Sequence, residues 1–156
     1  MMNRTLVTSL VLVASAAVVA GGCGGTSRDK AYSSSKTAYA AALDSICAAT
    51  NKAGNSIDLS STEKIASNGD DARDLLDKLA DKVEGLEPPD EVKTQAQSFA
   101  DGLKQEANEF GDMVDAAKDG DTAKIKEIQG KLSSEGAATS EDARFIGATG
   151  CARLFS

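Results

Sequence analysis

The stretch PDEVKTQAQSFADGLKQEANEFGDMVDAAK, residues 89–118, carries the clearest structural signal in this chain of 156 residues. Its apolar residues recur at intervals of three, four or seven, which is the spacing of one buried helix face. They are Val92, Ala96, Phe99, Leu103, Phe110, Val114 and Ala117. Pro89, Asp90 and Glu91 favour the first turn, because proline fits there and carboxylates complement the helix dipole. Gly120 suits the position just after the helix, so the sequence predicts one long helix.

Two amphipathic segments precede this stretch. Residues 36–53 are rich in alanine and predict a helix with one apolar face. That face consists of Tyr39, Leu43, Ile46 and Thr50. A second helix begins near Ser61, a favourable capping residue, or as late as Asp70, because NGDD at 68–71 interrupts its early part. Its stripe consists of Ile65, Ala72, Leu75, Leu76, Leu79, Val83 and Leu86. The prolines at 88–89 end it.

A fourth helix is expected from Thr122 toward residue 149, with Asp121 as its cap. Its buried face consists of Ile125, Ile128, Leu132, Ala143 and Ile146. The middle, SSEGAATSED, is polar and contains Gly136, so a kink or break near residues 134–140 is plausible. No strand pattern is visible. Four amphipathic helices with short turns predict an all-α fold, an antiparallel four-helix bundle.

The N-terminal segment has the features of a secretory signal. Arg4 precedes an apolar run over residues 6–20, and Gly21 and Gly22 lead into Cys23. A cysteine after small residues resembles the lipobox of bacterial lipoproteins, where the thiol takes a diacylglyceryl group and the mature chain carries palmitate-type acyl chains. The resemblance implies lipidation at Cys23. An ordinary signal cut near residue 20 is the alternative, because alanine stands where the family usually has leucine. A membrane span is disfavoured, since about 15 apolar residues are too few.

These boundaries give three parts: a lipoprotein signal peptide at 1–22, a flexible Gly/Ser-rich tether at 23–35, and a helical-bundle domain at 36–156. The whole chain has 24 acidic and 17 basic residues, one of which (Arg4) lies in the signal, so the mature chain carries 16 − 24 = −8. This negative charge argues against binding of nucleic acid and against direct adhesion to anionic lipid headgroups. We expect a monomer held on the outer face of the cell membrane by its N-terminal lipid, because two acyl chains anchor a protein stably.

The remaining cysteines, Cys47 and Cys151, are expected to form a disulfide outside the membrane; two buried free thiols are the alternative. Cys47 lies late in the first helix and Cys151 lies after the fourth, which runs antiparallel to it. Either the first helix starts beyond the end of the bundle, or the last segment folds back. We expect the first arrangement, with residues 54–61 climbing part of the bundle's length.

Four short motifs carry a family resemblance: ICAATN at 46–51, LEPPDE at 86–91, DGDTAKI at 119–125 and GCARL at 150–154. In this order they resemble a group of small bacterial secreted lipoproteins of unknown function. Those proteins have a cysteine in the first helix, a Leu-x-Pro-Pro turn between two long helices, a Gly-Asp turn and a final cysteine. The resemblance implies a helical bundle closed by Cys47–Cys151, and it implies no activity.

The chain has no histidine, which removes the commonest general base and metal ligand. We therefore predict no catalytic residue, no metal site and no cofactor. Glu106 and Glu109, and Asp112 and Asp115, stand one helical turn apart and could hold a metal, but the di-iron pattern requires histidine. All four are expected on a solvated face.

Two further candidate sites have structural explanations. Asp115, Asp119 and Gly120 fit calcium-loop positions, but Ala117 and Lys126 occupy ligand positions, so a helix–turn–helix corner is expected. Four phenylalanines could line a pocket for a lipid or small molecule, although core packing is expected and the last is least committed to it. They are Phe99, Phe110, Phe145 and Phe155.

These observations favour a non-enzymatic, lipid-anchored binding or scaffolding module of the cell envelope, whose partner is an envelope protein or a small ligand. The alternative is a soluble secreted helical protein that binds a small apolar ligand, which a cavity in the bundle would favour. An enzyme is the weakest possibility. A pocket with converging carboxylates and a raised pKa would revive it.

Overall fold

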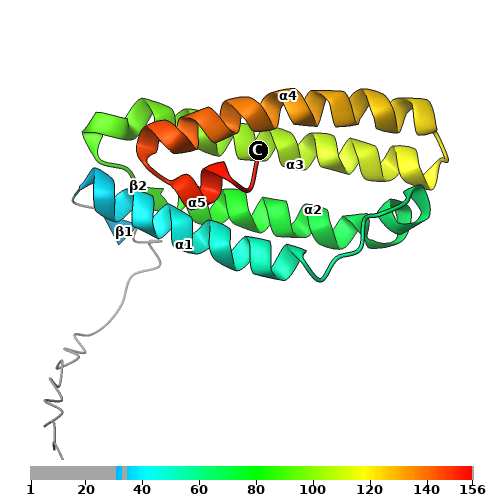
Figure 1. The fold of residues 1–156 in the computed structure, drawn as a ribbon, viewed down its shortest axis with the longest axis horizontal. Coiled ribbons are helices and arrows are strands. Elements are labelled where there is room, and N and C mark those ends of the chain that lie inside the picture. Colours follow the sequence, from blue (N-terminus) through cyan, green and yellow to red (C-terminus); the bar gives the residue numbers. More distant parts are fainter. Residues whose placement is uncertain (1–30, 33–34, 156) are drawn as a thin grey trace, which may run out of the picture.

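The computed structural model describes residues 31–32 and 35–155, so the signal segment and Cys23 lie outside it. Four long helices form an antiparallel bundle: α1 (Lys36–Gly54), α2 (Thr62–Glu84), α3 (Lys93–Lys118) and α4 (Thr122–Ile146) (Figure 1). The remaining elements are short: β1 (Ala31–Tyr32), β2 (Leu86–Glu87), the 3-10 turn η1 (Asp90–Val92) and α5 (Thr149–Ala152). The predicted all-α bundle is confirmed.

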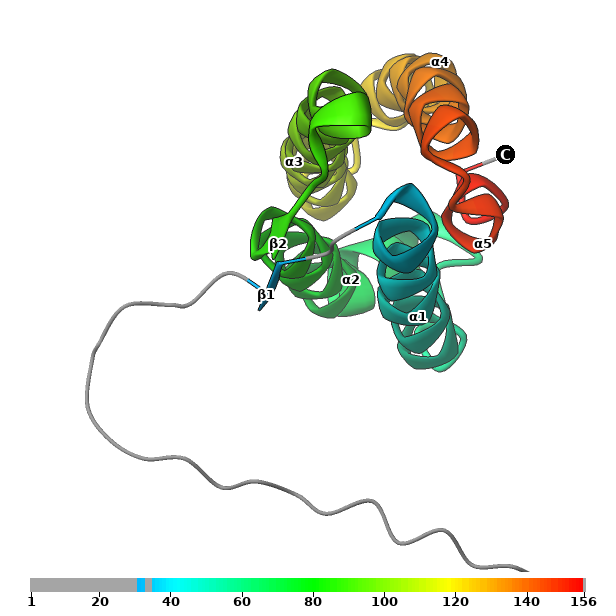
Figure 2. The ribbon, with the colours of Figure 1, turned by 90° about the vertical axis from the view of Figure 1, so that its left-hand side faces the viewer.

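Seen along its axis, the bundle places α3 beside both α2 and α4, while α1 packs beside α2 (Figure 2). The short α5 lies between α1 and α4 and packs against both. The fourth side of the bundle is therefore closed by the C-terminal segment. Within the described ranges, no helix is both long enough and apolar enough to cross a bilayer.

The apolar interior consists of two clusters. One lies at the end where α1 begins and includes Tyr39, Leu43, Leu79, Phe99, Leu103, Ile146 and Cys151. The other lies toward the turn between α3 and α4 and includes Ile65, Phe110, Met113, Val114, Ile125 and Ile128. On α3 the clusters meet between Leu103 and Phe110, where Glu106 is buried beside Ala107. A polar middle therefore interrupts the core of the bundle.

Helix α2 begins early and runs through the NGDD sequence without a break. Ser61 caps it, accepting a hydrogen bond from the backbone nitrogen of Lys64 at 3.3 Å. The alternative start near Asp70 is therefore wrong. Gly69 is buried where α2 meets α3, and a Cβ added there would lie 2.4 Å from Val114 Cγ2. The glycine is needed for close helix packing.

Helix α4 is also continuous, so the break considered near residues 134–140 is absent. Its polar middle is used in tertiary contacts. Ser140 donates its hydroxyl hydrogen to the Ala152 carbonyl oxygen at 2.9 Å, and a Cβ added at Gly136 would lie 3.2 Å from the Phe155 carbonyl oxygen. The helix ends at Gly147, which adopts φ +97°. Both small and polar residues therefore receive the returning C-terminal tail.

The chain folds back after Gly147, and this fold-back brings the two cysteines together. Cys47 and Cys151 form a disulfide with their Cα atoms 5.2 Å apart. Asp44 Oδ1 accepts hydrogen bonds from the backbone nitrogens of Gly150 at 2.7 Å and Cys151 at 3.1 Å. Our expectation that α1 would start beyond the end of the bundle is wrong, because the segment after α4 folds back to meet Cys47 within α1.

The segment before α1 and the start of α3 differ slightly from expectation. Ala31 and Tyr32, within the segment expected to be a tether, pair in parallel with Leu86 and Glu87. The third helix is preceded by η1 and begins as an α-helix only at Lys93. Its end is as predicted, since Gly120 has φ +73° in the turn before α4.

Candidate ligand-binding pocket

The predicted site residues lie in different environments. Cys47 and Cys151 are buried in the disulfide, and Cys23 lies outside the described residues. Phe99 is buried and packs edge-on against Phe155, with ring centroids 6.3 Å apart. Phe145 differs from the expectation of core packing, because it is 54% exposed and lies under the Lys36 ammonium at 4.9 Å. The four phenylalanines therefore do not form one pocket.

The carboxylates of α3 are divided between solvent and interior. Asp112 and Asp115 are exposed, as predicted, and Glu109 is half-buried. Glu106 is only 6% exposed, so the prediction of a solvated side chain is wrong for this residue. It stands three residues after Leu103 and four before Phe110, which places it on the buried stripe. The helical spacing in the sequence contained this signal.

Glu106 is held in place by α4. The Thr139 hydroxyl donates a hydrogen bond to Glu106 Oε1 at 2.6 Å, and Thr139 is itself buried. Burial raises the pKa of Glu106, the Thr139 hydrogen bond opposes this effect, and the charges of Glu135 and Glu109 raise the pKa further. Glu106 is therefore a buried carboxyl that favours its protonated form more than an exposed glutamate does.

Two neighbouring glutamates extend this acidic group between α3 and α4. Glu109 Oε2 and Glu135 Oε2 are buried without a hydrogen-bond partner in the described part of the chain. Burial raises the pKa of Glu135, and the neighbouring Glu109 carboxyl raises it further. Gln105 donates from its amide to the other oxygen of Glu135. A proton held between the two carboxyls would supply the missing donor.

Glu106 lines an apolar cleft of about 320 Å³ in the middle of the bundle. The cleft walls come from α1, α2, α3, α4, the loop after α1 and the C-terminal tail; they include Ile57, Leu76, Phe110, Leu132 and Phe155. Glu106 is the only charged residue among those lining it. Thr50 and Asn51 are the other polar side chains that line it, and apolar walls with a few polar groups are typical of small-molecule sites.

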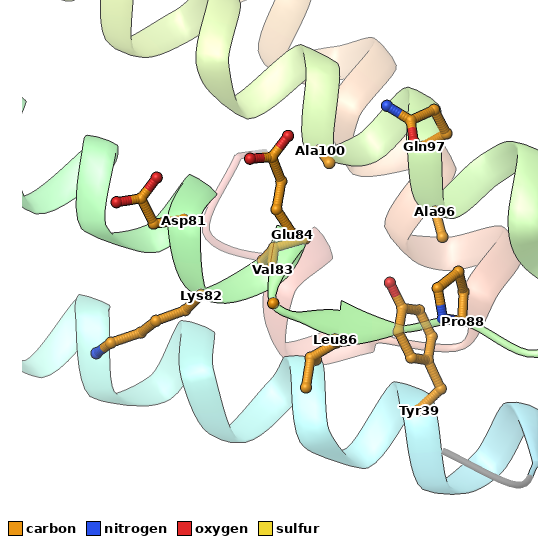
Figure 3. Close-up of a pocket in the computed structure, with 11 residues that line it drawn as sticks. Tyr39, Asp81, Lys82, Val83, Glu84, Leu86, Pro88, Ala96, Gln97 and Ala100 are labelled. Atoms are coloured by element: carbon orange, nitrogen blue, oxygen red, sulfur yellow. The ribbon is translucent and has the colours of Figure 1, made fainter. Parts of the chain in front are cut away.

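A larger hollow of about 600 Å³ lies near the α2–α3 connection. Figure 3 shows Tyr39 rising from α1 beside Pro88, while Glu84 extends toward Ala100 on α3. Asp81, Lys82 and Gln97 at this hollow are exposed to water, and Glu84 is paired with Lys104. Burial raises the pKa of the Tyr39 hydroxyl. Because its charged groups are solvated or paired, this hollow offers less binding chemistry than the smaller cleft.

No metal centre emerges from the residues that the structure describes, since no cluster of histidine, cysteine or carboxylate side chains is arranged to hold an ion. The segment compared with a calcium loop ends α3 at Lys118 and begins α4 at Thr122, as a helix corner requires. Lys118 pairs there with Asp70 on α2 at 3.0 Å. This corner is explained by helix packing.

No protein-family model matches the chain, and no curated protein and no solved structure matches it either. The function of the protein is therefore inferred from the bundle, its disulfide and the cleft.

Proposed function

We propose that this protein is a lipid-anchored, extracytoplasmic lipoprotein whose helical bundle binds a small apolar ligand. The observation that carries the binding function is the apolar cleft with Glu106 as its one charged lining residue. Its volume of about 320 Å³ lies within the range of small-molecule pockets, roughly 300–1,000 Å³. We therefore propose a small ligand, and not an envelope protein, as the binding partner.

The cysteine inventory supports the anchor. The chain has three cysteines, and Cys47 and Cys151 are bonded to each other. Cys23 is the remaining one, and it follows Gly21 and Gly22 at the end of an apolar run. An oxidising compartment fits the disulfide. The resemblance to small bacterial lipoproteins has the same implication for Cys23.

An enzyme is the second candidate, and the converging carboxyls Glu106, Glu109 and Glu135 favour it. The raised pKa values of Glu106 and Glu135 suit general acids. Against this reading, Glu106 is the only carboxyl among the residues that line the cleft, and the chain has no histidine to serve as a partner. The binding function requires neither a second catalytic group nor a nucleophile.

The anchor is tested by fractionation of cells that express the full chain. We expect wild-type protein in the membrane fraction, with a diacylglyceryl group on Cys23 shown by mass spectrometry of the N-terminal peptide. Cys23→Ser should lose the modification. A soluble wild-type protein with an unmodified N-terminus near Gly21 would instead support the secreted alternative.

The binding function is tested with 1-adamantanol, a compact apolar probe, on the full-length protein in phosphatidylcholine nanodiscs. Leu132→Trp places an indole in the cleft and should abolish binding measured by calorimetry. Leu86→Trp is the matched control, because Leu86 is also partly buried but lines the other hollow. Absence of binding to the wild type, or equal binding by both variants, would overturn the function.

A further inference from the structure

We infer that the cleft selects apolar molecules carrying a protonated amine, with Glu106 as the counter-ion. This inference rests on the proposed binding function and specifies the chemistry of the ligand. It follows from the position of the one charged group in the cleft and from the charges that surround it.

Glu106 has no cationic partner in the cleft. The residues that line the pocket include no lysine or arginine, and the hydrogen bond to Glu106 comes from the neutral hydroxyl of Thr139. A buried carboxylate is unfavourable unless it is paired or protonated. A ligand ammonium group would provide the missing positive charge, while its apolar body would contact the walls formed by Leu76, Phe110 and Leu132.

The carboxyl is also positioned for a specific head group. Thr139 holds Glu106 Oε1 at 2.6 Å, and Thr139 is itself confined by Gly102, where an added Cβ would lie 2.7 Å from its hydroxyl oxygen. Oε1 is therefore fixed on the α4 side of the carboxyl. An amine that donates to the carboxylate forms a charge-assisted hydrogen bond, which is stronger than one from a neutral hydroxyl.

The neighbouring charges exclude the opposite ligand class. Glu109 and Glu135 both raise the pKa of Glu106 through their charges, so the site presents a concentration of negative potential. A fatty-acid carboxylate placed in the cleft would be repelled by these groups and would leave Glu106 unpaired. The mature chain's charge of −8, from 16 basic and 24 acidic residues, acts in the same direction at longer range.

Three probes with one apolar cage test this selectivity: 1-adamantylamine, 1-adamantanol and 1-adamantanecarboxylate. Calorimetry on the full-length protein in phosphatidylcholine nanodiscs, corrected with empty nanodiscs, should show the amine binding at least about tenfold more tightly than the alcohol. The carboxylate should bind most weakly. Glu106→Gln should remove the amine preference while leaving the affinity for the alcohol within about twofold, because the side-chain shape is kept.

Asp112→Asn is the matched control, since this exposed residue lies on the same helix but is not among those lining the cleft; it should keep the preference. Alcohol binding without an amine preference, or a preference that persists in Glu106→Gln, would overturn the inference while the proposed function stands. Failure of all three probes to bind would overturn both. Thermal unfolding of each variant shows that the bundle is intact.

Discussion

Thr139 on α4 and Glu106 on α3 are joined by a 2.6 Å hydrogen bond in the interior of the bundle. Both residues are buried, and they lie where one apolar cluster ends and the next begins. The contact connects two helices that pack closely, and it fixes a carboxyl at the wall of the apolar cleft. The same pair thus affects both the stability of the bundle and the chemistry of its candidate site.

The stability of the domain should fall as pH rises above the ordinary glutamate pKa of about 4.3. Burial raises the pKa of Glu106 and of Glu135, so the folded state binds more protons than the unfolded state in this range. The free energy of unfolding then decreases with pH. Asp58 and Glu127 have lowered pKa values and act oppositely, but they are exposed and screened by solvent.

Thermal unfolding should therefore give a higher Tm at pH 5 than at pH 7.5, and Glu106→Gln should reduce this difference by raising the Tm at pH 7.5. Glu109 and Glu135 are the titratable groups that face Glu106, so the variant should keep part of the slope through Glu135. Identical pH profiles for the wild type and Glu106→Gln would show that Glu106 titrates as an exposed residue.

Loss of the disulfide should destabilise the bundle strongly. Cys47 and Cys151 are 104 residues apart, and closing a loop of this length stabilises by up to about 4–5 kcal/mol. The double variant Cys47→Ser/Cys151→Ser avoids a free thiol and should unfold at lower denaturant concentration. It should also weaken probe binding, because Leu154 and Phe155 beyond Cys151 line the cleft. Unchanged unfolding and unchanged binding would argue against a structural role for the tail.

Two glycines within helices should respond oppositely to alanine. Gly69→Ala should destabilise by about 1–3 kcal/mol, because its Cβ would overlap Val114 at 2.4 Å. Gly130→Ala should stabilise by about 0.5–1 kcal/mol, since nothing lies within 4 Å and alanine favours the helix. Urea unfolding measures both changes. Equal effects at the two positions would contradict the close approach of α2 and α3.

Two phenylalanines with opposite exposure provide a further comparison. Phe99→Ala should lose about 3–5 kcal/mol, because Phe99 is fully buried in the first cluster. Phe145→Ala should lose at most about 1 kcal/mol, the typical strength of an exposed cation–π contact such as that with Lys36. Chemical denaturation distinguishes them, and a larger loss at Phe145 would place its ring in the core.

The sequence predicts the long helices well because their apolar stripes and caps agree. Ser61, Gly120 and Asp121 perform the capping and turn roles assigned to them. The burial of Glu106 is not predicted, because the carboxylate spacing along α3 favours a solvated face. The positions of Leu103 and Phe110 on either side define the buried face instead.

The C-terminal fold-back is harder to predict from the sequence than the long helices are. Asp44 gives no local sign that it will accept hydrogen bonds from Gly150 and Cys151, more than a hundred residues later. The polar middle of α4 also suggested a break, whereas Thr139 and Ser140 are satisfied by tertiary partners. Local propensity cannot identify such partners, so the cleft that the tail completes was not predicted.

Native mass spectrometry of the protein released from its own membranes without reduction tests the proposed function most directly. We predict a chain that begins at a diacylglyceryl-modified Cys23, retains the disulfide and carries a small basic molecule that Leu132→Trp removes. An unmodified N-terminus near Gly21, together with no bound molecule that depends on Leu132, would contradict a lipid-anchored ligand-binding protein.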